Sequence, residues 1–215
     1  PVFAASARTH IGVKETMDSI SRLFPSPEDY PITCADGHEV KTCENEPFAG
    51  IVRRSVNDPF VGQLSFVRVY RGTLTPNTEV FNATKGEKER IGNILFVNGK
   101  KQTDCQEAKA GDVIAIPKLK NTYLNDTLCA VGDDTVFKPI EFPSPVAAYA
   151  VEPKTKGDED KIGVALQRAA SEDPSVRVER NKETHETILL GMGDMHLDVT
   201  LEHIKHRSKV DISHH

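Results

Sequence analysis

The 215-residue sequence lacks any long run of apolar residues. A membrane-spanning helix needs about 18 consecutive apolar residues, and a secretion signal needs a basic segment followed by an apolar run. Neither pattern is present, so we expect no membrane partner and a cytoplasmic location. The composition still supports packed cores, because 38% of the residues are hydrophobic and 27% are charged. A chain of this length predicts two domains of ordinary size.

Cysteines are few and do not have the spacing of a metal site. The four are Cys34, Cys43, Cys105 and Cys129. None forms a CxxC pair, and no HExxH motif is present. His196 and His203 lie on one predicted helix but are separated by about 10 Å of helical rise, which is too far to share a metal ion. The sequence therefore predicts free thiols in a reducing compartment and no metal site.

The phosphate-binding loop of GTPases and ATPases is also missing. That loop has the pattern GxxxxGK[ST], which occurs nowhere in the sequence. Asn181 and Lys182 resemble the start of a guanine-reading NKxD motif, but Thr184 replaces the aspartate and asparagine favours turns. We therefore expect no catalytic residue, no bound cofactor and no nucleotide hydrolysis in these 215 residues.

A net positive charge is absent as well. The chain holds 27 Lys and Arg against 32 Asp and Glu, a net charge of −5. Residues 31–133 hold 13 basic and 13 acidic residues, whereas residues 142–215 hold 10 and 13. The overall field does not attract nucleic acid, so we expect no DNA partner, and any RNA contact must be local. The first of these segments is the better place for such a contact.

Two proline-rich stretches, residues 24–31 and 142–145, divide the chain. Prolines at this density end helices and central strands, so both stretches are predicted to be linkers. The expected boundaries are 1–30, 31–141 and 142–213, with 214–215 as the remnant of an expression tag.

The first segment predicts a strand and a helix. Residues 2–6 form a short apolar run typical of a buried strand. Apolar residues then recur at helical spacing, at Val13, Met17, Ile20 and Phe24. This face needs a partner, so residues 1–24 are interpreted as the end of an α/β domain. The alternative is an ordinary N-terminal helical arm.

Residues 34–131 predict an all-β domain. The apolar segments are short, rich in β-branched and aromatic residues, and separated by turns that contain Asn, Asp and Gly. Regular spacing of this kind is typical of a closed barrel, which leaves no exposed strand edge.

Residues 142–213 predict a ferredoxin-like domain, because strand and helix patterns follow in the order βαββαβ. The first helix is expected to bury Ile162, Ala165, Leu166 and Ala169, and the second to bury Leu197, Leu201 and Ile204. Pro174 ends the first helix, and residues 181–184 form a hairpin turn. The fold class is therefore a multidomain chain with an all-β barrel followed by an α+β ferredoxin-like domain.

Several long runs of sequence resemble the elongation factor G family, and specifically its bacterial paralogues. The runs that resemble the second domain of that family are residues 58–74, 85–101 and 110–129. The runs that resemble its third domain are residues 142–180 and 191–198. Together they cover nearly the whole chain.

The resemblance implies that the chain is a non-catalytic middle portion of a ribosome-binding translation GTPase involved in translocation. The barrel would then be the translation-factor barrel called domain II, and residues 1–24 would end a GTPase domain. Ser6 and Ala7 match the family's Ser-Ala element, whose backbone helps recognise guanine. GTP and Mg²⁺ would be cofactors of the longer protein.

The resemblance also implies partners for the second and third domains. The second domain would rest on the RNA and protein of the small ribosomal subunit, with Arg68, Arg71, Lys100 and Lys101 as candidate RNA contacts. On the residues alone, a solvated surface balanced by acidic neighbours is the favoured interpretation of each of these basic clusters. The third domain would sit against the GTPase domain, and His196 would be an interdomain contact with a positional role.

Two alternatives stay open. The segment GMGDMHLD departs from the family's usual GMGELHLE at Asp194, Met195 and Asp198. A paralogue that remodels or protects ribosomes without translocating therefore fits the sequence too. A small-molecule-sensing regulatory module is the alternative from another class, because fold alone does not fix function.

Overall fold

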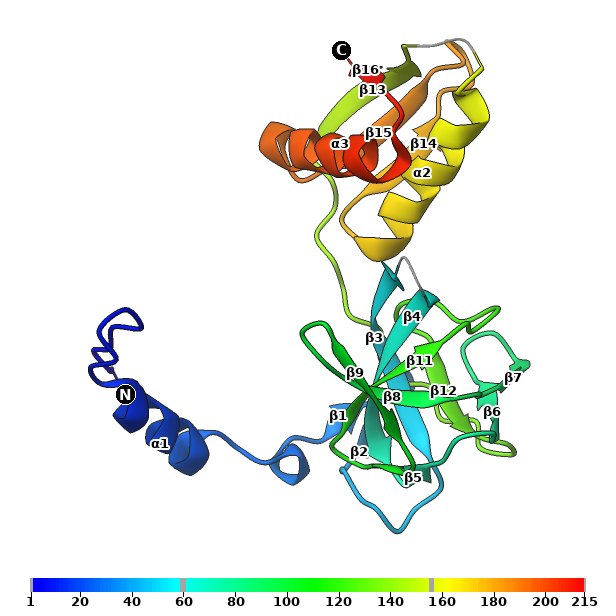
Figure 1. Cartoon of the computed structure of the whole chain (residues 1–215). Helices are drawn as coiled ribbons and strands as arrows, with labels where there is room; N and C mark the ends of the chain where they lie inside the picture. Colours follow the sequence, from blue (N-terminus) through cyan, green and yellow to red (C-terminus); the bar gives the residue numbers. More distant parts are fainter. Residues whose placement is uncertain (1, 59–60, 155–156, 215) are drawn as a thin grey trace.

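A computed structural model describes residues 2–58, 61–154 and 157–214. Figure 1 shows an isolated N-terminal helix, a β-barrel and an α+β domain, in that order along the chain. Among the described residues, no helix is both long and apolar enough to cross a membrane.

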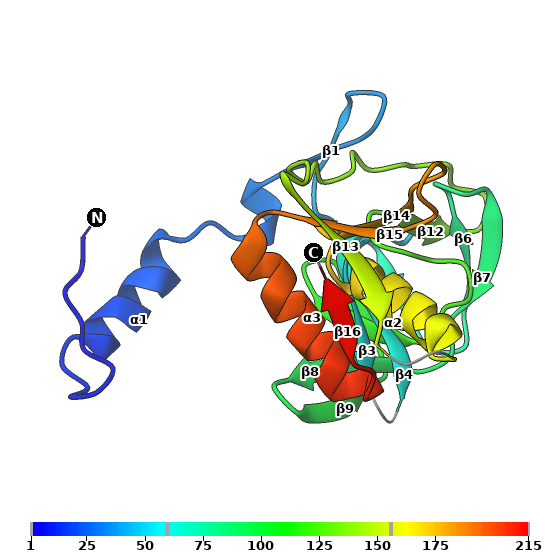
Figure 2. The same cartoon turned by 90° about the horizontal axis from the view of Figure 1, so that it is seen from above.

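The N-terminal segment contains the predicted helix, α1 (Val13–Leu23). It extends away from the rest of the chain in both views (Figures 1 and 2) and contains no buried residue. Its expected inward face is exposed at Met17, Ile20 and Phe24. The predicted strand at residues 2–6 does not form, and only an isolated bridge joins Ser6 to Ile11. A strand needs a neighbour to pair with, and the described residues place none beside this segment.

The linker after α1 contains a short 3-10 helix, η1 (Pro27–Asp29), and Ser26 is its N-cap residue. The Ser26 hydroxyl accepts a hydrogen bond from the Glu28 amide at 3.2 Å, and the Asp29 carboxylate accepts one from the Ser26 amide at 2.7 Å. This reciprocal capping gives the proline-rich linker a defined conformation just before the barrel.

Twelve short strands form the second region. They are β1 (Ile32–Thr33), β2 (Glu39–Val40), β3 (Ala49–Asp58), β4 (Gly62–Arg71), β5 (Thr73–Leu74), β6 (Glu79–Asn82), β7 (Glu87–Arg90), β8 (Ile94–Asn98), β9 (Lys101–Cys105), β10 (Ala108–Lys109), β11 (Val113–Pro117) and β12 (Thr127–Ala130). Eight of them form one antiparallel sheet in the order β7-β6-β12-β3-β4-β11-β8-β9. β1 pairs with β2, and β5 pairs with β10.

The large sheet curls around an apolar core. Alternate residues of β3 and β4, such as Val52, Val67 and Val69, are fully buried in it. Ile91 and Cys105, from opposite edges of the sheet, belong to the same core cluster. No ladder joins β7 to β9 in the described ranges, so side-chain packing rather than a continuous ladder brings the two edges together.

The third region has the predicted βαββαβ order. Its elements are β13 (Ala147–Pro153), α2 (Glu159–Glu172), β14 (Arg177–Arg180), β15 (Thr187–Gly191), α3 (Asp194–Ser208) and β16 (Ile212–His214). The strands pair antiparallel in the order β14-β15-β13-β16, which is the ferredoxin-like topology. The prediction of a barrel followed by a ferredoxin-like domain is therefore confirmed.

Both helices of this domain bury the faces that their periodicity predicts. The buried residues are Ile162, Ala165, Leu166, Leu197, Leu201 and Ile204, and Ala169 packs against them with part of its surface exposed. α2 ends at Glu172, and Asp173 follows as its C-cap just before Pro174. α3 carries Lys205 and Arg207 in its last turn, where the helix dipole favours cations.

His214, the first of the two residues expected to be a tag remnant, is the last residue of β16. It pairs with Val151 and stacks on Tyr149 with ring centroids 4.7 Å apart. His215 lies outside the described residues, and the origin of the two histidines stays a prediction.

Candidate nucleic-acid interface

A groove on the barrel combines basic and aromatic side chains. Arg53 on β3 and Arg68 on the neighbouring strand β4 line it together with Tyr30, Tyr70 and Lys138. The Arg53 guanidinium donates a hydrogen bond to the Tyr70 hydroxyl at 2.7 Å. Both guanidinium groups approach the Tyr70 ring, at 5.8 Å for Arg53 and 6.0 Å for Arg68.

The groove has the chemistry of a site for a phosphate backbone. Among the described residues that line it, none is acidic. Three basic side chains can contact phosphate oxygens. Tyr30 lies at the edge of the groove, is 67% exposed and can stack on a base. This groove is the candidate nucleic-acid interface, and we call it the basic groove.

Sequence reasoning found one of the groove's basic residues as a candidate site and missed two. Arg68, which the sequence analysis gave as a candidate RNA contact, lies in the groove. Arg53 belongs to a basic pair visible in the sequence, and Lys138 carries no sequence signal. Lys138 reaches the groove because its amide donates to the Thr33 carbonyl at 2.9 Å, which brings the segment after β12 beside β1.

Arg71 has a different environment from the other candidates. Its guanidinium forms ion pairs with Asp133 and, at 3.5 Å, with Glu46, and it donates a hydrogen bond to the Thr135 hydroxyl at 3.1 Å. The side chain is only 13% exposed. Breaking a buried pair leaves an uncompensated charge, so this arrangement favours a structural role over an RNA contact.

Lys100 and Lys101 lie at the β8–β9 turn and are exposed. Neither forms an ion pair with another residue that the structure describes. Lys100 lines a separate hollow beside Arg54, so the structure does not bring these lysines into the basic groove. The candidate contacts therefore occupy two surfaces of the barrel.

Ser6 and Ala7 lie in the turn before α1. The Ser6 hydroxyl accepts a hydrogen bond from the Thr9 amide at 3.3 Å, and Ala7 is exposed. The Ser6 amide donates to the Ile11 carbonyl at 2.9 Å, so the backbone of Ser6 is tied into this local turn.

His196 connects the two helices of the ferredoxin-like domain. Its Nδ1 accepts a hydrogen bond from the Met192 amide at 3.1 Å, so its Nε2 carries the proton and faces Asp173 Oδ2 at 3.2 Å. Burial opposes ionisation of Asp173, but hydrogen bonds from Ser175 and His196 outweigh it and lower the pKa of this carboxyl. The contacts of His196 in this structure are within its own domain.

The barrel meets the ferredoxin-like domain at Glu172, the last residue of α2. One carboxylate oxygen of Glu172 accepts a hydrogen bond from the Asn57 amide on β3 at 3.1 Å, and the other pairs with Arg207 at 2.7 Å. Arg54 lines a small pocket at the same junction with Arg168 and His203. These contacts are polar, which is typical of interfaces between domains that move relative to each other.

A barrel with a groove suited to nucleic acid, joined to a ferredoxin-like domain, is an arrangement found in translation factors. Residues 47–131 match the family model described as Elongation factor G domain 2, and residues 142–215 match the model described as Elongation Factor G, domain III. The chain belongs to the elongation factor G family.

A curated relative and a solved structure support this assignment. The chain is 40% identical over 220 residues to "Elongation factor G" of Paracoccus denitrificans (strain Pd 1222), a match that covers 98% of this chain and 31% of that protein. It is also similar to a solved crystal structure, that of the protein ttk003000868 from Thermus thermophilus. That match has a TM-score of 0.79 and 29% identity, and covers 98% of this chain and 30% of the other. The chain thus spans about a third of the length of these relatives.

Proposed function

We propose that the chain is the non-catalytic middle portion of a ribosome-binding GTPase that couples nucleotide state to translocation. The observation that carries this proposal is the 40% identity to an elongation factor G over 98% of the chain. In the proposed protein, residues 31–141 form domain II and residues 142–213 form domain III. GTP and Mg²⁺ bind elsewhere in the longer protein, which acts in the cytoplasm.

The exposed face of α1 supports a missing GTPase domain. Met17, Ile20 and Phe24 are each more than a third exposed, which is unusual for three apolar side chains at helical spacing. In the proposal, residues 1–30 are the end of the GTPase domain and the linker that follows it, and this face packs against the rest of that domain. Ser6 and Ala7 then lie at its guanine site.

The proposal places small-subunit RNA against the barrel. The basic groove offers Arg68 with Arg53 and Lys138, and the β8–β9 turn offers Lys100 and Lys101. Because the net charge is negative, binding depends on these local contacts and is sensitive to salt. Arg71 serves the barrel's internal ion pairs instead.

Neutralising two basic residues on an RNA-contacting surface should flatten the salt dependence of ribosome binding. Each phosphate contact contributes about 0.7 to 0.9 to the slope of log affinity against log salt, so two lost contacts reduce the slope by roughly 1 to 2. The experiment is ribosome pelleting across a salt series with the full-length protein that contains this chain. One variant carries Arg68→Gln with Lys138→Gln, and another carries Lys100→Gln with Lys101→Gln.

A matched control is Lys88→Gln with Lys109→Gln on the same barrel. These lysines pair with Glu79 and Glu44 and are at least half exposed, as Lys138 is beside Glu141, but they lie outside the proposed RNA-contacting surfaces, so their loss should leave the slope unchanged. An unchanged slope in both test variants would contradict RNA binding by the barrel surfaces proposed here.

The 215-residue chain on its own should not bind guanine nucleotides. Phosphate and Mg²⁺ binding both need a loop that the sequence lacks. Calorimetric titration of the chain with GDP should show no binding heat, whereas the full-length protein should bind. Micromolar binding by the chain alone would show that it contains a nucleotide site.

A further inference from the structure

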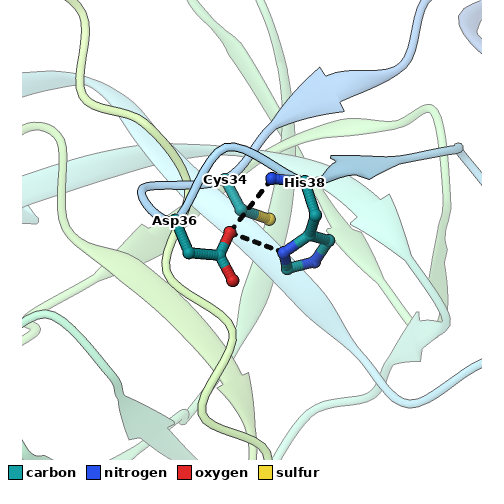
Figure 3. A group of neighbouring side chains, drawn as sticks. All are labelled: Cys34, Asp36 and His38. Carbon is teal, nitrogen blue, oxygen red and sulfur yellow. Dashed lines mark hydrogen bonds and ion pairs between the residues drawn. The ribbon is translucent and has the colours of Figure 1, made fainter.

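The turn between β1 and β2 brings a thiol, a carboxylate and an imidazole together. Figure 3 shows the side chains of Cys34, Asp36 and His38 converging on the same side of this turn. Each offers one ligand atom, and these atoms lie within 4.8 Å of one another. We propose that Cys34, Asp36 and His38 form a binding site for a borderline-soft divalent cation of the Zn²⁺ type.

The backbone explains why the three side chains converge. The Cys34 amide donates to the His38 carbonyl at 2.8 Å, and the Gly37 amide donates to the Cys34 carbonyl at 3.0 Å. Gly37 has a φ of 92°, a left-handed conformation that glycine adopts without strain. Residues 35–37 form the turn itself, and the hydrogen bond between the Cys34 amide and the His38 carbonyl closes it, so the side chains at positions 34, 36 and 38 lie close together.

The donor set matches the cation. Zn²⁺ binds thiolate sulfur at about 2.3 Å and imidazole nitrogen or carboxylate oxygen at about 2.0 to 2.2 Å, so tetrahedral ligands are roughly 3.3 to 3.8 Å apart. Asp36 Oδ1 and His38 Nδ1 are 2.5 Å apart in a hydrogen bond, closer than two ligands of one Zn²⁺, so in the proposal these exposed side chains rotate apart when the cation binds. Three protein ligands leave the fourth position to water.

Cation binding is coupled to the loss of a proton. The bound cation displaces the thiol proton of Cys34 to solvent, and His38, which binds through Nδ1, keeps its ring proton on Nε2.

The site lies between the barrel core and its surface. Cys34 is only 2% exposed and packs in a cluster with Ile51, Cys129 and Phe137, whereas the side chains of Asp36 and His38 are 68% and 54% exposed. A cation therefore has access from solvent and binds a ligand fixed in the core.

Cys34 also bridges to Phe137, so a bound cation ties the first hairpin of the barrel to the segment that leads into the ferredoxin-like domain. Its role is structural, and it does not depend on the proposed ribosome function.

Titration of the reduced full chain with Co²⁺ tests the proposal, because a cobalt–thiolate bond gives a charge-transfer absorption in the near ultraviolet. We expect a saturable band with one equivalent of Co²⁺, and its loss when Zn²⁺ competes. Cys34→Ser should abolish the band. Cys43→Ser removes the half-buried cysteine nearby in sequence and should leave the band unchanged.

His38→Gln and Asp36→Asn provide a second test, because both residues are exposed and their replacement should not unfold the barrel. Loss of outer-shell partners alone weakens metal sites by about 10- to 100-fold, so loss of a direct ligand should weaken Co²⁺ binding by at least about tenfold. Zn²⁺ should also raise the Tm of the wild-type chain, and the rise should disappear in His38→Gln.

Three results would overturn the proposal. They are the absence of a saturable thiolate band in the wild-type chain, a band that survives in Cys34→Ser, and an affinity that is unchanged in His38→Gln and Asp36→Asn. The last result would assign the band to an isolated thiol, and the turn would then be held by hydrogen bonds alone.

Discussion

Phe137→Ala should destabilise the barrel by about 3 to 5 kcal/mol, the usual range for truncating a buried phenylalanine. Phe137 is only 1% exposed, and its ring contacts the Tyr70 ring with centroids 5.3 Å apart. Its amide also donates to the Thr127 hydroxyl at 3.0 Å, so the backbone around the resulting cavity is held in place. A site that cannot collapse keeps most of the cavity penalty.

Urea unfolding followed by circular dichroism measures this change. Because the chain contains two separate cores, the barrel and the ferredoxin-like domain should be followed as separate transitions if the curve shows two steps. Val131→Ala is the matched control, since Val131 is 50% exposed at the end of the barrel, and it should change stability by less than about 0.5 kcal/mol. Equal effects of the two substitutions would place Phe137 outside the core.

Leu201→Ala should destabilise the ferredoxin-like domain by about 2 to 5 kcal/mol. Leu201 lies on the buried face of α3 between Leu197 and Ile204 and is 7% exposed. That face packs against the sheet and against α2, so the removed side chain leaves a cavity between three elements. The free energy of unfolding in urea gives the cost directly.

Val199→Ala on the same helix is the control for Leu201→Ala. Both substitutions remove a branched apolar side chain from α3, but Val199 is 42% exposed. The control should cost less than about 0.5 kcal/mol, because Val199 is partly exposed and Ala has a higher helix propensity than Val. A much larger loss for Leu201→Ala therefore reports burial. A loss below about 0.5 kcal/mol for Leu201→Ala would contradict the orientation of α3.

The helix faces and the fold class were predictable from the sequence because they depend on local periodicity. The spacing of Leu197, Leu201 and Ile204 requires one buried helical face, wherever the partner lies. The order of strand and helix patterns leaves few topologies for residues 142–213, and the ferredoxin-like one is confirmed. The family resemblance added the relation to elongation factor G.

The N-terminal strand shows where local pattern fails. Residues 2–6 have the composition of a buried strand, but a strand is stable only when its backbone groups pair with a neighbour. Helix α1 forms in the same segment because its hydrogen bonds are internal. Without a neighbouring element among the described residues, α1 therefore forms and the strand at residues 2–6 does not.

The sequence by itself determined the order of domains, the buried faces of the helices and the absence of a phosphate-binding loop, since each is a local property of the chain. Only the tertiary structure decided which basic residues lie together on an exposed surface and which are held in internal ion pairs. It places Arg71 against Asp133, 62 positions away, and joins Arg53, Arg68 and Lys138 in one groove. It also turns Cys34, Asp36 and His38 toward one point. These placements depend on contacts between distant segments and on the backbone path of a turn. Neither can be read from the periodicity of the sequence.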